Sequence, residues 1–269
     1  MRIGLAKLIL AGLVTAAVPA VLAAADGPTA PADPSAPGTR VSGDADGRRT
    51  MRRLPANLGR SAVGVFNKDN LVPFLAGGAA TGIASIWDED VRREATANNW
   101  GESLETAGGP LWSSVFVAGM FTAGRLSHGT RFRATTYDML DAAIVNLAYT
   151  ELLKVAVGRE RPNGQDEKSF PSGHTSNAFA LAAVAERHYG WKVGVPAYLA
   201  AGLVGASRIQ QDKHYLSDVV AGAALGYIVG RTVVRVNGRP LEEAVRGVSI
   251  QVSPILGRDV RGVRVAVWF

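Results

Sequence analysis

Six apolar stretches separated by short polar segments run through the middle of this sequence and limit the folds that it can adopt. They lie near residues 71–87, 110–125, 136–157, 175–188, 195–207 and 217–232. None of them alternates apolar and polar residues as a half-buried strand does. The pattern predicts an all-α fold, a six-helix bundle that occupies residues 51–235.

Two of these stretches are long enough to cross a membrane. Leu71–Trp87 and Thr106–Gly124 carry no charge over 17 and 19 residues, which lies within the range of a spanning helix. The other stretches are shorter or interrupted by charges, and a mean hydropathy of +0.10 is low for a chain made mostly of membrane spans. Glycines at positions 222, 226 and 230 suit close helix contacts in lipid and in a soluble core alike. The sequence leaves both environments open.

Residues 1–25 and 26–50 are expected to lie outside the bundle. The first segment has two basic residues ahead of an apolar run and ends in small residues, which is typical of a secretory signal peptide. An uncleaved membrane anchor is the alternative, because the apolar run is somewhat long. The second segment is rich in Pro, Ala, Gly and Asp, which predicts a disordered linker. We therefore expect an exported protein, periplasmic or associated with the envelope.

The C-terminal residues, 236–269, show a different pattern. Val248–Val252 and Val263–Phe269 alternate with period two and are separated by a Gly-Arg-Asp segment, which predicts a small β-hairpin extension. A hairpin that covers the bundle is the simpler interpretation. A membrane-facing sheet is the alternative, although two strands cannot close a barrel.

The composition narrows the chemistry. The chain has no cysteine, which excludes disulfides, thiolate metal sites and a cysteine nucleophile. The formal net charge of +6 falls to +4 without Arg2 and Lys7 of the signal segment. This mild excess suits an anionic substrate or a bilayer surface, and no stretch of the sequence resembles a nucleic-acid-binding motif.

A first pair of cations stands at the end of the third predicted helix. Lys154 and Arg161 are seven residues apart, close to two helical turns, so they can share one face. Pro162 ends the helix. A solvated basic helix end explains this pair alone equally well.

A second motif, Pro-Ser-Gly-His, lies at the start of the fourth predicted helix. Ser172 can cap the helix, and Gly173 lets the backbone approach a ligand closely. The free N–H groups and the positive helix end then favour an anion. His174, with an ordinary pKa near 6.5, can give a proton to a leaving oxygen.

A third motif combines Arg208, His214 and Asp218. The histidine and the aspartate are four residues apart, so in a helix the carboxylate would lie beside the imidazole. An aspartate that accepts the Nδ1 proton would leave Nε2 with a free lone pair, as a nucleophile or base needs. Arg208 adds a two-pronged partner for phosphate oxygens.

Taken in this order, Lys-x6-Arg-Pro, Pro-Ser-Gly-His and Ser-Arg-x5-His-x3-Asp resemble the three-part signature of the phosphatidic acid phosphatase type 2 and vanadium-dependent haloperoxidase superfamily. Every signature position is filled between residues 154 and 218, and the surrounding helices extend the resemblance to about 70–232. Three motifs together are a specific signal, whereas the first motif alone is weak. The linker and the hairpin lie outside the resemblance.

The resemblance implies a phosphatase that needs no metal or other cofactor and whose partner is a phosphate-ester substrate, with lipid phosphates and pyrophosphates in its range. His214 would attack phosphorus and form a phosphohistidine, Asp218 would orient it, and His174 would protonate the leaving alkoxide. The phosphate-binding residues would be Lys154, Arg161, Ser172, Gly173 and Arg208.

Other functions fit the same motifs. In a haloperoxidase the same groups would hold vanadate, with His214 as its ligand. In an integral lipid phosphatase the substrate would be phosphatidate, phosphatidylglycerophosphate or undecaprenyl pyrophosphate. A noncatalytic envelope-binding module is a third option, against which the intact motifs argue. If a signal peptide preceded six spans, the loop around His174 would face the cytoplasm, whereas integral relatives keep it outside. This conflict favours a soluble domain or peripheral membrane association.

Overall fold

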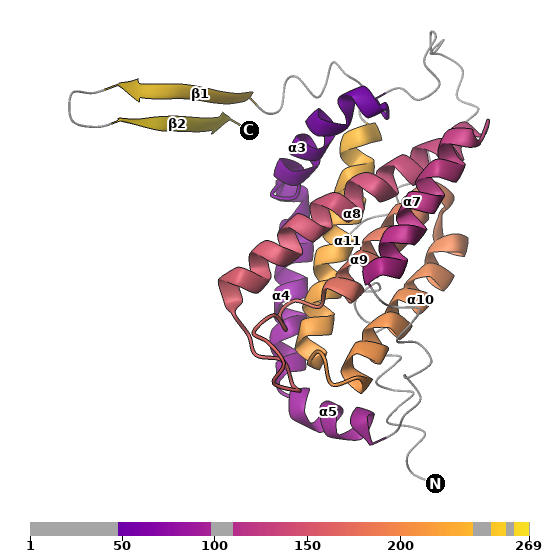
Figure 1. Cartoon of the computed structure of the whole chain (residues 1–269), viewed down its shortest axis with the longest axis vertical. Helices are drawn as coiled ribbons and strands as arrows, with labels where there is room; N and C mark the ends of the chain where they lie inside the picture. Colours follow the sequence, from indigo (N-terminus) through magenta and orange to yellow (C-terminus); the bar gives the residue numbers. More distant parts are fainter. Residues whose placement is uncertain (1–47, 98–109, 239–248, 257–260, 269) are drawn as a thin grey trace.

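The computed structural model describes residues 48–97, 110–238, 249–256 and 261–268. Helices dominate these residues, and they pack side by side into one elongated bundle (Figure 1). The predicted signal peptide and most of the predicted linker lie outside the described residues. In chain order the α-helices are α3 (Leu54–Gly64), α4 (Leu71–Ser85), α5 (Asp88–Thr96), α7 (Pro110–Leu126), α8 (Thr130–Val157), α9 (Gly173–Tyr189), α10 (Trp191–Gln210) and α11 (Leu216–Gly238). Two short 3-10 helices, η2 (Met51–Arg53) and η3 (Lys68–Asn70), precede α3 and α4.

The predicted helical fold is confirmed, but the count of six helices is too low, because eight α-helices occur in the part of the chain that the structure describes. The six predicted stretches correspond to α4 and to α7–α11. The pattern misses α3 and α5. In α3 the apolar residues are interrupted by buried polar ones, Asn57 and Ser61, and α5 is mostly charged, with Val91 as its one buried apolar side chain. A search for apolar stretches therefore passes over both helices.

Helix α11 is the central helix of the bundle and packs closely on α9. A Cβ atom added at Gly222, Gly226 or Gly230 would lie 2.6, 2.0 or 2.4 Å from a backbone carbonyl oxygen of α9 or of the residue before it. These contacts leave no room for a side chain, so the glycine spacing seen in the sequence brings the two backbones together. In the fold, this spacing serves the packing of the core.

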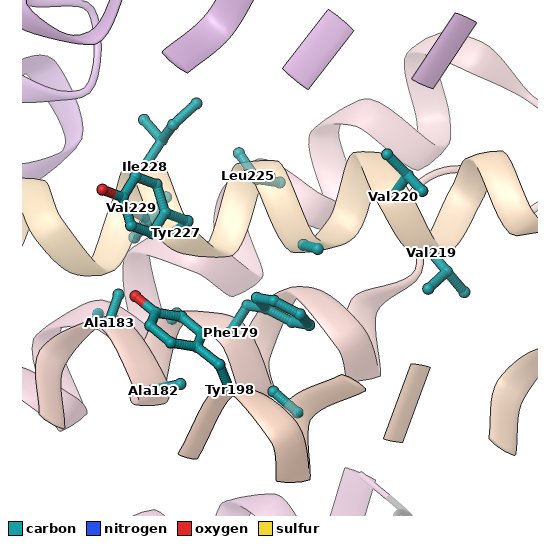
Figure 2. Close-up of a cluster of buried hydrophobic side chains, with 14 of the residues drawn as sticks. Phe179, Ala182, Ala183, Tyr198, Val219, Val220, Leu225, Tyr227, Ile228 and Val229 are labelled. Carbon is teal, nitrogen blue, oxygen red and sulfur yellow. The ribbon is translucent and has the colours of Figure 1, made fainter. Parts of the chain in front are cut away.

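The apolar core lies where α9, α10 and α11 meet. Figure 2 shows Phe179, Tyr198 and Tyr227 close to one another, with the ring centroids of Phe179 and Tyr198 5.8 Å apart and those of Tyr198 and Tyr227 6.4 Å apart. The hydroxyl of Tyr198 donates to Glu186 over 2.8 Å, so this buried ring keeps a polar partner. The core fixes α9 and α10 against α11, and each of these helices carries a predicted site residue.

The outer faces of several helices are apolar. Large apolar side chains are exposed on four helices: Leu71, Val72, Leu75 and Ile83 on α4; Val115 and Phe116 on α7; Leu147, Leu152 and Val155 on α8; Val193, Val195, Leu199 and Leu203 on α10. We call these the apolar faces. By length and composition only α11, among the described helices, is able to cross a membrane by itself, and 78% of its apolar segment is buried in the bundle. Helices α4 and α5 reach that standard only as a pair bent by 66°.

A buried polar cluster occupies one end of the bundle, where α3 meets α8 and α11. Asp138 of α8 accepts hydrogen bonds from Arg49, His188 and Asn237, each at 2.8–2.9 Å. Asp141, one turn further along α8, accepts from Ser61 of α3 and from Asn237. We call this group the distal cluster. The contact with Asp138 ties His188, in the last turn of α9, to α8.

Two strands follow the helices. Strands β1 (Ser249–Leu256) and β2 (Arg261–Trp268) pair antiparallel, with Ser249 opposite Trp268 and Leu256 opposite Arg261. They lie where the sequence predicts a hairpin. Figure 1 shows the two strands side by side, and the interpretation that the hairpin covers the helices stays a prediction.

Candidate active site

The three sequence motifs meet at the end of the bundle opposite the distal cluster. Lys154 lies in the last turn of α8 and Asp138 of the distal cluster near its start, about 24 Å apart at 1.5 Å per residue. Helix α9 begins at this end, α10 ends there, and α11 begins there (Figure 1). Gly158 ends α8 in the left-handed conformation, with φ of 57°, and turns the chain into the loop between the first two motifs.

His214 is buried in the short connection between α10 and α11, with 2% of its surface exposed. Its Nδ1 lies 2.7 Å from the backbone carbonyl oxygen of Ser169. Because a carbonyl can only accept, Nδ1 carries the proton and Nε2 keeps its lone pair. Burial and, next, the charge of Arg161 lower the pKa of His214 to about 3. The imidazole is therefore neutral at pH 7, as a nucleophile must be.

The predicted hydrogen bond between His214 and Asp218 is wrong. The Nδ1 of His214 lies 3.9 Å from the nearer carboxylate oxygen of Asp218, beyond hydrogen-bonding distance. The prediction assumed that both residues belong to one helix, but α11 begins at Leu216, after the histidine. Asp218 instead occupies the first turn of α11 and accepts the backbone N–H of Tyr215 at 2.8 Å.

Asp218 acts on His214 through Ser169. The Oγ of Ser169 donates to Oδ2 of Asp218 over 2.6 Å, and the carbonyl of the same serine accepts the Nδ1 proton of His214. Arg159 donates to the other carboxylate oxygen over 2.7 Å. Burial raises the pKa of Asp218, while the hydrogen bond from Ser169 and the charge of Arg159 oppose that rise. Asp218 thus holds Ser169 in place, and Ser169 in turn orients the imidazole of His214.

His174 lies in the first turn of α9 and lines a cavity of about 330 Å³. Its Nε2 is buried and has no hydrogen-bond partner among the described residues. The pKa of His174 is lowered to about 4, first by burial and then by the charges of Arg208 and Lys154. The prediction of a proton donor with an ordinary pKa is therefore wrong, because among these protein groups His174 is neutral at pH 7. An anion placed among the same cations opposes their effect and raises this pKa.

The cavity continues from His174 along one face of α8. Lys154, Thr150 and Gly173 line its polar part, and its apolar part is lined by Val117 and Ala118 of α7 and by Leu140, Ile144 and Leu147 of α8. A Cβ at Gly173 would lie 3.2 Å from Thr150 and 3.5 Å from the Nζ of Lys154. Glycine here lets the lysine lie against the start of α9, where backbone N–H groups favour an anion.

The three predicted phosphate-binding cations all act on His174, and the charges of Arg161 and Lys154 also lower the pKa of His214. Lys154 pairs with Glu151 over 2.8 Å, and Arg161 pairs with Asp166 over 2.7 Å. Arg208 has 2% of its surface exposed, at the end of α10. The charges of Lys154, Arg161 and Arg208 all lower the pKa of His174, so the structure brings the three motifs together.

Ser172 occupies the N-cap position of α9, but its side chain makes no hydrogen bond to the helix backbone. Its buried Oγ instead lies 2.9 Å from Oγ1 of Thr175, and its backbone N–H donates to the carbonyl of Asp218 over 3.0 Å. The expectation of a side-chain cap is wrong. The serine links the second motif to the third through its backbone.

The sequence interpretation misses three residues of the site, and a fourth residue, Asp88, that lies behind it. Arg159 stands between the two cations of the first motif, Ser169 stands two residues before the second motif, and Lys213 precedes His214. Lys213 adds to the charges that lower the pKa of His174. These residues are adjacent to motif positions, which is the signal that could have identified them. Asp88 of α5, which bonds Arg159 and Ser217, has no such signal.

This arrangement places three cationic side chains and the start of a helix beside two neutral imidazoles at one end of a helical bundle. Phosphate fits the site, since cationic side chains and helix N-termini are its usual ligands. A model of the PAP2 superfamily matches residues 137–240, which include all three motifs. The resemblance predicted from the motifs is therefore confirmed.

Curated relatives share this part of the chain. Over 124 residues the chain is 44% identical to a lipid A 1-phosphatase of Porphyromonas gingivalis, and the match covers 45% of this chain and 27% of that protein. It is 29% identical over 146 residues to lipid phosphate phosphatase 1 of Arabidopsis thaliana, covering 36% of this chain and 45% of that one. The chain thus spans less than half the length of either relative.

One solved structure is similar over a larger share of the chain. It is described as the first transmembrane PAP2 type phosphatidylglycerolphosphate phosphatase from Bacillus subtilis, with 20% sequence identity and a TM-score of 0.49. The similarity covers 67% of this chain and 92% of that one.

Proposed function

We propose that this protein is a phosphatase that hydrolyses lipid phosphates through a phosphohistidine on His214 and needs no metal ion. The observation that carries the proposal is the unbonded, buried Nε2 of His174, which lines a cavity together with Lys154 and Gly173. A buried polar atom without a hydrogen-bond partner lowers the stability of a native fold, so such an atom marks the place of a ligand.

In the first step Nε2 of His214 attacks phosphorus, and the bond from phosphorus to the leaving oxygen breaks. The proton stays on Nδ1, whose hydrogen bond the carbonyl of Ser169 accepts, and this bond stabilises the charge that develops on the ring. Lys154, Arg161 and Arg208 bind the phosphoryl oxygens and offset their negative charge.

His174 gives its proton to the leaving alkoxide. The bound phosphate raises the pKa of His174 above the value of about 4 that burial and the cations set, so the ring is protonated when substrate is present. Water then attacks the phosphohistidine and passes a proton to the now neutral His174. The N–P bond breaks, inorganic phosphate leaves, and both histidines return to their starting states.

Two features favour a lipid as the alcohol part of the substrate. The cavity is apolar along α7 and α8, so it suits a hydrocarbon chain attached to the phosphate. The apolar faces on α4, α7, α8 and α10 suit contact with lipid, because large exposed apolar areas are rare on proteins surrounded by water. The names of the relatives, a lipid A 1-phosphatase and a lipid phosphate phosphatase, agree with this substrate class.

An exported location at the envelope belongs to the same proposal. It rests on the signal-like residues 1–25 together with the apolar faces. Release of phosphate from phosphatidate by the washed-membrane fraction, and little by the soluble fraction, is the expected result.

The test compares His214→Ala with His128→Ala, since His128 is exposed and far from the motifs in sequence. Phosphate release is measured with para-nitrophenyl phosphate, phosphatidate and undecaprenyl pyrophosphate. We expect no turnover in His214→Ala, unchanged turnover in His128→Ala, and no effect of EDTA on the wild type. Quenching in alkali is expected to trap a phosphorylated wild-type protein. Turnover by His214→Ala, or bromide oxidation dependent on vanadate in place of phosphate release, would contradict the proposal.

A further inference from the structure

Helix α5 contacts both loops that carry the site, although it lies outside the residues that match the PAP2 superfamily. Figure 1 shows it across the end of the bundle at which α11 begins. It is bent by 66° from the preceding helical segment, Lys68–Ser85. Its first residue, Asp88, has 6% of its surface exposed, and such a buried carboxylate needs hydrogen bonds and a cation.

Asp88 obtains both from the motif loops. Its Oδ1 accepts the backbone N–H of Ser217 over 2.8 Å, and its Oδ2 accepts the hydroxyl of Ser217 over 2.7 Å. Arg159 donates to the same Oδ2 over 2.9 Å. Asp88 therefore ties the loop after α8 to the first turn of α11.

Arg159 continues this chain of contacts toward the nucleophile. Its other nitrogen donates to Asp218 and to Ser217, each over 2.7 Å, and its guanidinium lies over the ring of Tyr215, 4.2 Å from the ring centre. Asp218 holds Ser169, which accepts the Nδ1 proton of His214. Four successive hydrogen bonds thus lead from α5 to the imidazole.

Arg92, one turn further along α5, makes a second connection. It donates to both carboxylate oxygens of Asp212, over 2.7 and 3.0 Å, and to the carbonyl of Pro162 over 2.8 Å. Asp212 has φ of 56°, a left-handed conformation that costs a non-glycine residue energy. The two-pronged ion pair holds this turn two residues before His214.

We propose that Asp88 is a positioning residue, and that α5 holds the two catalytic loops in the register that aims His214 at phosphorus. The inference rests on the proposed function, because it assigns Asp88 a part in the reaction of His214. Asp88 does not touch the cavity, so it acts through Arg159, Asp218 and Ser169. A displacement of the imidazole by a fraction of an ångström is enough to slow an in-line attack.

The test compares Asp88→Asn and Asp88→Glu with Asp90→Asn, which changes an exposed carboxylate on the same helix that pairs with Arg93. We expect Asp88→Asn to lower kcat about 10- to 100-fold and to change KM by less than about two-fold, since the phosphate-binding cations stay in place. Asp88→Glu is expected to recover part of kcat, and Asp90→Asn to match the wild type. Equal losses in kcat for Asp88→Asn and Asp90→Asn would overturn the proposal, as would a loss confined to KM.

A double-mutant cycle separates positioning from a general loss of structure. If Asp88 and Arg159 act in one chain of contacts, Asp88→Asn combined with Arg159→Gln lowers kcat no more than the larger single change. Additive losses would contradict the proposal. Binding of inorganic vanadate, measured by calorimetry, is expected to persist in Asp88→Asn. A wild-type protein that neither binds vanadate nor releases phosphate would refute the proposed phosphatase itself, whereas an active wild type with an unaffected Asp88→Asn refutes only the role of α5.

Discussion

Both ends of the bundle pair a buried carboxylate with an arginine, but the distal cluster also buries a second carboxyl group, that of Asp141, among neutral hydrogen-bond donors. At the active-site end a guanidinium, that of Arg159, bonds both Asp88 and Asp218. In the distal cluster Asp141 accepts hydrogen bonds from the neutral groups of Ser61 and Asn237, and its Oδ1 has no hydrogen-bond partner among the described residues. Burial raises the pKa of Asp141 to about 6, and neighbouring Asp138 adds to the rise.

This contrast indicates that the active-site end is organised around fixed charges, whereas the distal end contains a carboxyl group that titrates near neutral pH. The pKa values of the two active-site histidines are shifted in the direction opposite to that of Asp141. His174 and His214 have pKa values of about 4 and 3 in the fold, below their ordinary value near 6.5. Protonation in acid therefore lowers the stability of the fold through these two histidines and raises it through Asp141.

The largest effects are expected from removing one buried carboxylate at each end. Asp138→Asn leaves Arg49 and His188 without their carboxylate, and we expect it to lower the free energy of unfolding by about 3–5 kcal/mol. The folded fraction should keep the wild-type kcat, because the change lies far from the site. Asp218→Asn is expected to lower kcat about 100- to 1,000-fold, since it releases Ser169. Urea unfolding and phosphate release measure the two quantities. A large loss of kcat in Asp138→Asn would break the proposed separation of the two ends.

A smaller effect is expected from acid. A group whose pKa is lowered in the fold costs stability as the pH falls below its unfolded pKa, so each buried histidine removes about 1.4 kcal/mol per pH unit below about 6.5. We expect His174→Gln to reduce the slope of unfolding free energy against pH by this amount between pH 6 and pH 4.5. His128→Gln, which changes an exposed ring, is the control. Parallel slopes for the wild type and His174→Gln would show that the ring is not held neutral.

The smallest effect is expected at Asp141, and its sign is opposite. Its folded pKa of about 6 lies above the unfolded value of 3.8, so the fold binds the proton more tightly. At pH 7 the buried negative charge of Asp141 lowers the free energy of unfolding, and this loss disappears as the carboxyl is protonated between pH 6 and pH 4. Asp141→Asn should raise the free energy of unfolding at pH 7 by about 1–3 kcal/mol and make acid unfolding steeper. Lower stability of this variant at pH 7 would show that the ionised carboxyl contributes favourably.

The sequence predicted the apolar helices and the meeting of the three motifs because both depend on local patterns. Spacing placed Lys154 and His174 on the ends of consecutive helices that meet, and the structure confirms that both line one cavity. Helix α5 was missed because its residues are charged and its partners lie 71 and 129 positions away in the chain. No local signal encodes such contacts.

The errors within the site have the same origin. The four-residue spacing of His214 and Asp218 predicted a direct hydrogen bond, but α11 begins only after His214. The carbonyl of Ser169, in another loop, accepts the hydrogen bond from Nδ1 instead. The low pKa of His174 follows from burial and from cations of the first and third motifs. These properties arise only once the chain is folded.

The glycines of α11 have a consequence for how this protein can change. Because peptide groups of α9 and α11 touch directly, the separation between the second and third motifs is set by the main chain and not by the volume of core side chains. Substitutions among the aromatic and aliphatic residues elsewhere in the interior can therefore be repacked while the distance between the reacting groups stays constant. An engineer who redesigns this interior has freedom at Tyr198 or Tyr227 but none at Gly226.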